Sequence, residues 1–328
     1  MNVNRIPNTL FYRVSYSGVE KYATLKFGQG LLESNIYSIS NDIELSKCHT
    51  RQEGAPITIS SQNGNISSCC GVLNANIISN FGTARLNNTI VSHIKTIDKK
   101  IQLNSCSRAK SIKTDGGDIN LALDSRASTI ETKKGTVKLF KSNATTIINY
   151  HGKTSIDSST IGSLKTVNGI ISLKNAHVLQ DVIQAEAAPL SITASIIVGM
   201  LQTSVESLTI DGLTIIHHLY LKKTHSNIAM NFSDSDLSPV KRAKPYERKI
   251  SHRGIPGSVG EITRNRAAQA KTIIIERGGT LGELKLEEGA ECTLILKEDA
   301  CFKGNPDVAG LNVIYIVNAT SSMFSESV

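Results

Sequence analysis

The sequence predicts an all-β protein, namely a right-handed parallel β-helix (β-solenoid) with coils of about 18 residues and three short faces. Two observations lead to this fold. Apolar residues recur at an interval of about one coil, and apolar and polar residues alternate within each short run, as they do in strands with one buried face. Right-handed winding is expected because parallel β crossovers favour that hand.

Two apolar ladders run through the middle of the chain. Successive members lie 16 to 19 residues apart, and chance does not hold such an interval over so many turns. The first ladder is Ile59, Ile77, Ile94, Ile112, Ile130, Ile148, Leu164, Val182, Leu201 and Leu219. The second ladder is Leu86, Leu103, Leu121, Leu139, Ile156, Leu173, Ile192, Ile210 and Ile228. We expect both ladders to face the interior of the solenoid.

A third, weaker face lies between the second ladder and the next coil. Its expected inward residues are Ala127, Ile161, Ala176, Val178, Val198, Leu213 and Ile215. The runs themselves are too short to be stable alone, so each must stack on the neighbouring coil, about 4.8 Å away.

Polar residues recur at the corners between the runs. Gly, Asn and Asp are expected to supply the positive φ angles of tight corners. The recurring pairs are Asn104-Ser105, Asp124-Ser125, Ser142-Asn143, Ser158-Ser159 and Lys174-Asn175. Stacked Asn and Ser side chains can hydrogen-bond from coil to coil, so a structural role is the favoured interpretation.

The repeat unit, with its I-x-T run, glycine turn and I-x-L run, resembles bacterial bactofilin-like and adhesin-like β-solenoid domains. The stretch Gly278 to Ala290 (GGTLGELKLEEGA) is similar to bactofilin-like sequences too. The resemblance is one of pattern and covers Ile57 to Met230 and Thr272 to Phe302. It implies a non-enzymatic protein, since bactofilin-like proteins build cytoskeletal polymers. This solenoid is longer than theirs and is interrupted by a basic segment.

Composition shifts divide the chain into five parts. These are an N-terminal segment and cap (1–50), the main solenoid (51–232), a basic insert with Pro and Gly (233–271), resumed coils (272–318) and a flexible tail (319–328). We expect Met1 to Tyr37 and the strand around Val313–Val317 to cap the two ends. Association through those ends is a further possibility.

Most of the net charge of +8 lies in the insert, because the stretch from Leu237 to Lys271 contains nine lysines and arginines but only two glutamates. The predicted binding residues are Lys241, Arg242, Lys244, Arg248, Lys249, Arg253, Arg264 and Arg266. An acidic protein surface or an anionic lipid is the expected partner. Nucleic acid is less expected because only Tyr246 interleaves the basic run. The alternative is a solvated loop that leaves and rejoins the solenoid.

No catalytic residue, metal site or cofactor is predicted. Asp157, Asp181 and Asp211 lie in separate coils, whereas glycosidases need paired carboxylates. His217 and His218 are adjacent, so on a strand they should point to opposite sides, although His225 could approach one of them. By the same reasoning, one of Cys69 and Cys70 should point inward. The six cysteines lack C-x-x-C spacing, which favours free thiols in a reducing compartment.

The sequence therefore predicts a non-enzymatic scaffold or interaction protein that presents repeated solenoid faces and a basic docking insert. The alternatives are a carbohydrate-active β-helix enzyme (lyase or glycosidase) and a translocated bacterial effector that binds a host protein or anionic lipid. No apolar run is long enough for a transmembrane helix, and the first ten residues lack a Sec-type apolar stretch. A cytoplasmic location or a non-Sec secretion route is expected, and the tail Ser321–Val328 is a candidate secretion signal.

Overall fold

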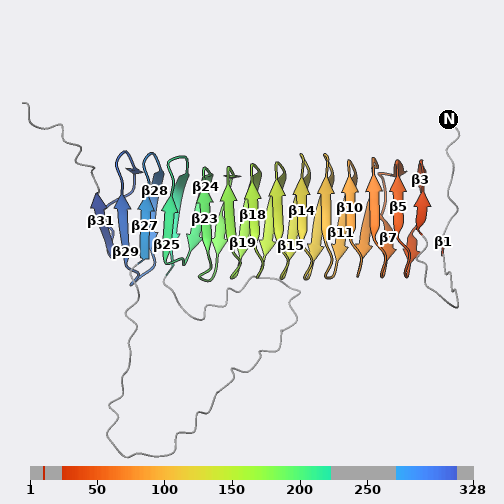
Figure 1. Cartoon of the computed structure of the whole chain (residues 1–328), viewed down its shortest axis with the longest axis horizontal. Coiled ribbons are helices and arrows are strands. Elements are labelled where there is room, and N and C mark those ends of the chain that lie inside the picture. The colour runs from red at the N-terminus through yellow and green to blue at the C-terminus, as the bar shows by residue number, and fades with distance from the viewer. Residues whose placement is uncertain (1–9, 12–23, 223–270, 316–328) are drawn as a thin grey trace, which may run out of the picture.

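The structure, a computed structural model, describes residues 10–11, 24–222 and 271–315. Its regular secondary structure in this part of the chain consists of β-strands, which pair in parallel with the strand one coil earlier and one coil later. The strands stack into one long array with β3 near one end and β31 at the other (Figure 1). The predicted parallel β-solenoid is confirmed, and its right-handed winding stays a prediction.

The strands belong to four sheets. The 15-stranded sheet contains β1 (Leu10–Phe11), β4 (Ile36–Ser38), β7 (Ile57–Ser61), β9 (Ala75–Ser79), β11 (Ile90–Thr96), β13 (Arg108–Thr114), β15 (Arg126–Thr132), β17 (Asn143–Asn149), β19 (Thr160–Thr166), β21 (His177–Val178), β22 (Val182–Gln184), β24 (Ile196–Thr203), β26 (Ile215–Leu221), β28 (Thr280–Leu286) and β30 (Cys301–Phe302). The 10-stranded sheet contains β2 (Leu25–Phe27), β5 (Ile43–Ser46), β8 (Ile66–Cys69), β10 (Ala84–Asn87), β12 (Ile101–Asn104), β14 (Ile119–Ala122), β16 (Val137–Phe140), β18 (Thr154–Asp157), β20 (Ile171–Lys174) and β23 (Leu190–Thr193). A 4-stranded sheet contains β25 (Ser207–Ile210), β27 (Lys271–Ile275), β29 (Cys292–Leu296) and β31 (Leu311–Tyr315), and β3 (Gly30–Leu32) pairs with β6 (Cys48–Thr50).

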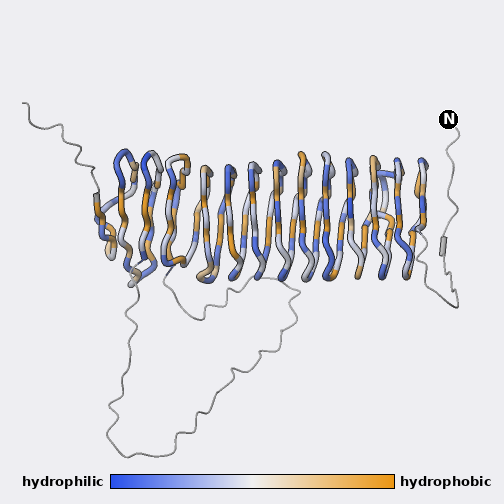
Figure 2. Tube along the Cα trace, in the orientation of Figure 1, coloured by the Kyte–Doolittle hydropathy of each residue, from blue (hydrophilic) through white to orange (hydrophobic). Residues whose placement is uncertain are grey.

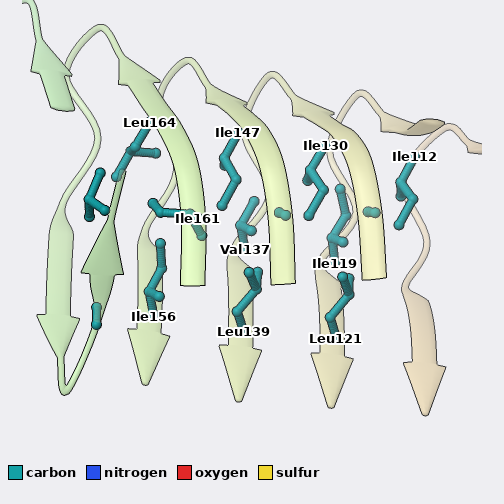
Figure 3. Close-up of a cluster of buried hydrophobic side chains, with 14 of the residues drawn as sticks. Ile112, Ile119, Leu121, Ile130, Val137, Leu139, Ile147, Ile156, Ile161 and Leu164 are labelled. Atoms are coloured by element: carbon teal, nitrogen blue, oxygen red, sulfur yellow. The ribbon is translucent and has the colours of Figure 1, made fainter. Parts of the chain in front are cut away.

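The core is a set of apolar stacks in which each side chain lies on its counterpart one coil away. Ile94, Ile112 and Ile130 are paired in register on β11, β13 and β15, and all three are buried. Leu121 and Leu139 stack in the same way on β14 and β16. Figure 3 shows these two rows facing each other across the interior. Hydrophobic and hydrophilic residues alternate along each coil (Figure 2), which leaves one side of every strand for the core.

The first ladder is correct in register except at one position. The inward residue of β17 is Ile147, which pairs with Ile130 and Leu164, so the predicted inward position of Ile148 is wrong. Ile148 instead pairs with Glu131 and Lys165 on the outer side. This coil is one residue shorter than the preceding one, and a shift of one residue moves a side chain to the opposite face. Ile228 of the second ladder lies outside the described residues.

The predicted third face is continuous with the first, because one long strand bends to form both. In β13, Ala109 and Ile112 are buried, and between them Lys110 is exposed and Ser111 is half-buried. The register skips Lys110, since Ala109 pairs with Ala127 and the next pair is Ser111 with Thr129. Two successive outward positions in a strand require a bend, and the curved strands of Figure 3 show it.

The third-face residues were predicted correctly only in part. Ala127, Ile161, Ala176 and Val178 are buried as expected. The inward positions of Val198, Leu213 and Ile215 are wrong, because these side chains are 39%, 76% and 36% exposed. Ile197 and Ile216 occupy the core there. The register of β24 on β26 shifts between Ile197 and Met200, so a regular interval does not apply at this point.

Buried hydroxyl groups link the coils at one corner, as the polar pairs predicted. The Ser142 N–H donates to Ser159 Oγ at 3.1 Å, and Ser159 Oγ donates in turn to the Asp157 carbonyl oxygen at 2.7 Å. Two coils further on, Ser195 Oγ accepts the Ala176 N–H at 3.0 Å. Each hydroxyl therefore satisfies backbone groups that the corner removes from the sheet.

At another corner of the coil, glycine does not supply the expected positive φ but allows neighbouring coils to approach closely. Asn88, Asp124 and Asn175 do have positive φ, but Gly117 and Gly135 do not. A Cβ on Gly135 would overlap the Gly117 carbonyl oxygen, so the absence of a side chain lets successive coils approach. The Gly135 N–H donates to Thr132 Oγ1 at 3.0 Å, and Gly117 is held in the same way by Thr114.

The solenoid begins earlier than predicted and continues on both sides of the basic segment. Strands β2 and β5 already pair in register within residues 1–50, so the boundary expected at residue 51 lies inside the solenoid. At the other end, β28 pairs with β26 and β27 pairs with β25, although residues 223–270 separate them in sequence. The strands before and after residues 223–270 therefore belong to adjacent coils of one stack. Among the described residues, no helix has the length and apolar character needed to cross a membrane.

Candidate functional site: an arginine groove

A groove of about 530 Å³ follows the bend of the long strands along the solenoid axis. Apart from Gln52, its lining comes from seven successive coils, from Leu73 to Leu179, so its length is roughly six strand spacings of 4.8 Å, or about 29 Å. The floor passes over Ala109, Ala127 and Ala144, whose small side chains occupy the inward position of the bend. We call this feature the arginine groove.

The arginine groove has a single sign of charge. Arg108, Lys110 and Arg126 belong to its lining, which contains no aspartate, glutamate or histidine. All three cations are exposed. Within the described residues, neither guanidinium makes an ion pair. The groove therefore concentrates positive potential.

The two arginines occupy the same position in adjacent coils. Arg108 pairs with Arg126 in the register of β13 on β15. A second pair of cations, Lys95 and Lys113, is also in register, but there the next residue of the row is Glu131. The carboxylate of Glu131 lies 2.9 Å from Lys113 Nζ and compensates that charge. The row of Arg108 and Arg126 continues instead to Asn143, which is neutral.

A loop closes one end of the arginine groove. Residues 51–56 are exposed, and Gln52 of this loop belongs to the groove lining. Asn74 holds the loop, because its Nδ2 donates to the Gly54 carbonyl oxygen at 3.1 Å. Ser92 Oγ donates to Asn74 Oδ1 at 2.9 Å and fixes that amide. Hydrogen bonds through Asn74 therefore fix the loop that forms this end of the groove.

The predicted docking residues lie outside the described residues; they are Lys241, Arg242, Lys244, Arg248, Lys249, Arg253, Arg264 and Arg266. Lys271, counted with them in the basic segment, is a different case because it is buried at the start of β27. Its Nζ donates to the carbonyl oxygens of Ser204 at 2.8 Å and Val205 at 3.0 Å. Because Lys271 lies in β27 and makes these contacts, it belongs to the solenoid. Burial lowers its pKa.

Two of the three single carboxylates hold backbone groups. Asp211 accepts the Ala194 N–H at 2.9 Å, and Asp181 accepts the Met200 N–H at 2.8 Å. Asp157 pairs in register with Lys174 and Phe140 on the outer face. None of the three belongs to the lining of the arginine groove.

His217 and His218 are both exposed, so the expectation that they point to opposite sides is wrong. The strand bend lies between them and removes the simple alternation. His218 Nδ1 lies 3.3 Å from Glu283 Oε2 on the next coil. His225 lies outside the described residues. Within the part of the chain that is described, no three His, Cys, Asp or Glu side chains gather in a way that could hold a metal ion.

The cysteines are free thiols in the described structure, as expected. The expectation that one of Cys69 and Cys70 points inward is wrong, because both are exposed. Cys70 has a φ of 58°, and this corner conformation interrupts the alternation of the strand. Cys292 is buried at the start of β29, and desolvation raises its pKa to about 11.

Sequence patterns alone did not point to Arg108, Lys110 and Arg126, because the charge of the chain outside the basic segment is close to zero. A signal was nevertheless present, since the two arginines are spaced by one coil. Comparison of the chain with protein-family models, with curated proteins and with solved structures finds no match.

Proposed function

We propose that this protein is a non-enzymatic interaction scaffold that binds an extended acidic polypeptide segment in the arginine groove. The observation that carries the proposal is the lining itself, which has three cations on two adjacent coils, β13 and β15, and no carboxylate on any of its seven coils. The resemblance to bactofilin-like scaffolds agrees with a non-enzymatic role. Docking through the basic segment 233–271 remains a second part of the same proposal.

Electrostatics favour an acidic ligand. Like charges directly opposite each other on neighbouring strands are unfavourable, and Arg108 and Arg126 hold such positions. A ligand carboxylate between the two guanidinium groups would remove this repulsion and gain charge-assisted hydrogen bonds. Each exposed ion pair of this kind contributes about 0.2–1 kcal/mol, so affinity would come from several contacts along the groove.

The residue types of the lining favour a polypeptide over a sugar or a nucleic acid. The lining contains no aromatic side chain, whereas stacking on aromatic rings is the usual means of holding unpaired bases. Glycoside hydrolysis needs two carboxylates that flank one bond, and the groove lining supplies none. The exposed apolar side chains of Ile90 and Leu179 in the lining offer van der Waals contact to the apolar groups of a peptide.

Binding of a fluorescein-labelled oligoglutamate peptide, followed by anisotropy on the full chain, tests the proposal. The Arg108→Ser/Arg126→Ser variant should bind roughly 2- to 30-fold more weakly, since two exposed pairs are lost. Arg85→Ser/Lys138→Ser is the matched control. It removes the same charge from exposed positions on β10 and β16 of the 10-stranded sheet and should bind like the wild type.

Further ligands separate the alternatives. An oligoserine peptide should not bind, and binding of oligoglutamate should weaken as salt rises. If the two double variants lose the same affinity, the groove is not the site and only the net charge matters. If a polygalacturonate fragment binds more tightly than oligoglutamate and depends on Arg108 and Arg126, the ligand class is an acidic polysaccharide and the proposal is wrong.

A further inference from the structure

Cys69 and Cys70 present two thiols at one point of the solenoid surface. Their Sγ atoms are 3.1 Å apart, and both side chains are exposed. Cys69 ends β8 on its outer side, and Cys70 follows at the corner with a φ of 58°. The corner therefore turns two successive side chains to the same side, which a continuous strand does not do.

The corner itself does not explain the second cysteine. Among non-glycine residues, Asn and Asp are the types enriched at positive φ, and Asn88 takes the equivalent position one coil later. Lys47 takes it one coil earlier. The turn therefore accepts several residue types and does not by itself require cysteine at position 70.

The backbone around the pair is held on both sides. The Cys70 N–H donates to the Asn87 carbonyl oxygen at 3.0 Å, and the Lys47 N–H donates to the Cys69 carbonyl oxygen at 2.8 Å. The hydrogen bond with Cys70 and partial desolvation raise the pKa of Cys69, and the positive charge of Lys47 opposes this in part. The two sulfur atoms are therefore positioned before any reaction takes place.

We propose that Cys69 and Cys70 form a reversible vicinal disulfide by exchange with a low-molecular-weight disulfide such as oxidised glutathione. The thiolate of one cysteine attacks the small disulfide, which forms a mixed disulfide and releases one glutathione thiolate. The second cysteine, as thiolate, then attacks the protein-bound sulfur and releases the second glutathione. The two protein thiols are oxidised, one small disulfide is reduced to two thiols, and the two protons pass to the released thiolates.

Covalent geometry makes the closed form easy to reduce. Adjacent Cα atoms are about 3.8 Å apart across a trans peptide, and disulfides usually join Cα atoms separated by about 4.4–6.8 Å. A strained disulfide has a more oxidising potential than a structural one and is the labile kind. The Cys69–Cys70 disulfide would form when the concentration of small disulfide is high, and it would be reduced again when small thiols predominate.

Cys106 provides an internal comparison. It is exposed and has a φ of 64° at an equivalent corner, but its neighbours in sequence are Ser105 and Ser107. The same small disulfide should attach to Cys106 and remain there, because no adjacent thiol can displace it. Trypsin separates the two sites, since Gln52–Arg85 contains only the vicinal pair and Ile101–Arg108 contains only Cys106.

The test treats the full chain with oxidised glutathione, quenches with acid and alkylating reagent, and analyses tryptic peptides by mass spectrometry. In the wild type, the peptide of Cys69 and Cys70 should lose two hydrogens and carry no glutathione, while the Cys106 peptide should carry one. Cys69→Ser and Cys70→Ser should each trap glutathione on the remaining thiol. Cys106→Ser should lose only its own adduct, and dithiothreitol should restore every thiol.

Several outcomes would overturn the proposal. These are a stable glutathione adduct on Cys69 or Cys70 in the wild type, a bond from either to another cysteine, or no reaction at the pair. The mass of the wild-type peptide that contains Cys69 and Cys70 tests the proposal even if a serine variant fails to fold. The site is independent of the arginine groove, so neither proposal depends on the other.

Discussion

Arg108 lies in direct register with Arg126 on the adjacent coil, and the two guanidinium groups share a groove whose lining contains no carboxylate. Other neighbouring coils place opposite charges close together. Lys113 and Glu131 are 2.9 Å apart, and Lys297 lies 2.8 Å from Glu276. The arrangement of Arg108 and Arg126 is costly for the isolated solenoid and favourable for an anionic ligand. An anionic partner bound there would remove the repulsion between the two arginines.

The core register can be tested by adding one charge. Leu121→Asp places a carboxylate in a stack where Leu121 is only 1% exposed, and it should cost several kcal/mol of unfolding free energy. Ile112→Asp should behave in the same way. Asn120→Asp is the control, since this half-buried neighbour lies on the outer side of β14 and should change stability far less. Urea denaturation measures both, and equal losses would contradict the inward position of Leu121.

The glycine corner gives a second stability test. Gly135→Ala should destabilise the fold by about 1–3 kcal/mol, because the added Cβ would overlap the Gly117 carbonyl oxygen and force the coils apart. Gly28→Ala has no heavy atom within 4 Å of its new Cβ and serves as the control. Thermal unfolding should separate the two variants, and an unchanged melting temperature for Gly135→Ala would refute the close approach of these coils.

The basic segment needs its own test. Replacing Lys241, Arg242, Lys244, Arg248 and Lys249 together with Ser should abolish binding to an acidic protein or anionic vesicle and leave the solenoid folded. Surface charge changes away from packed groups usually cost within about 0.5 kcal/mol. Vesicle flotation and pull-down at low and high salt are the measurements. If the quintuple variant and the wild type bind the same ligands equally, the segment is a loop without a docking role.

The buried thiol of Cys292 predicts a loss of stability at high pH. Desolvation raises its pKa from 9.0 to about 11, and the Lys271 ammonium opposes this in part. Between those values the unfolded chain releases the thiol proton while the folded chain keeps it, so stability falls as pH rises through this window. Cys292→Ala should remove this contribution. Denaturation midpoints at pH 8 to about 11 would show a shallower decline in the variant than in the wild type, and parallel declines would contradict the assignment.

The choice between Ile147 and Ile148 shows how far a repeat can be read from one sequence. Both residues are apolar, so the pattern allows either to face inward. Pairing with Ile130 on one side and Leu164 on the other selects Ile147. The same applies to Ile197 and Val198, where an irregularity in β24 shifts the interval. Local pattern identifies the ladder, and stacking on neighbours selects the residue.

The sequence by itself determined the parallel solenoid, because stacks such as Ile112 on Ile130 repeat an apolar residue once per coil and bury it only if coils lie on one another. Only the tertiary structure decided the sites. Arg108 and Arg126 become neighbours when a coil closes, and the groove that they line follows the bend of the long strands at Lys110. Cys69 and Cys70 share one side because the chain takes a positive φ at the corner, a backbone choice that alternation along a strand does not reveal.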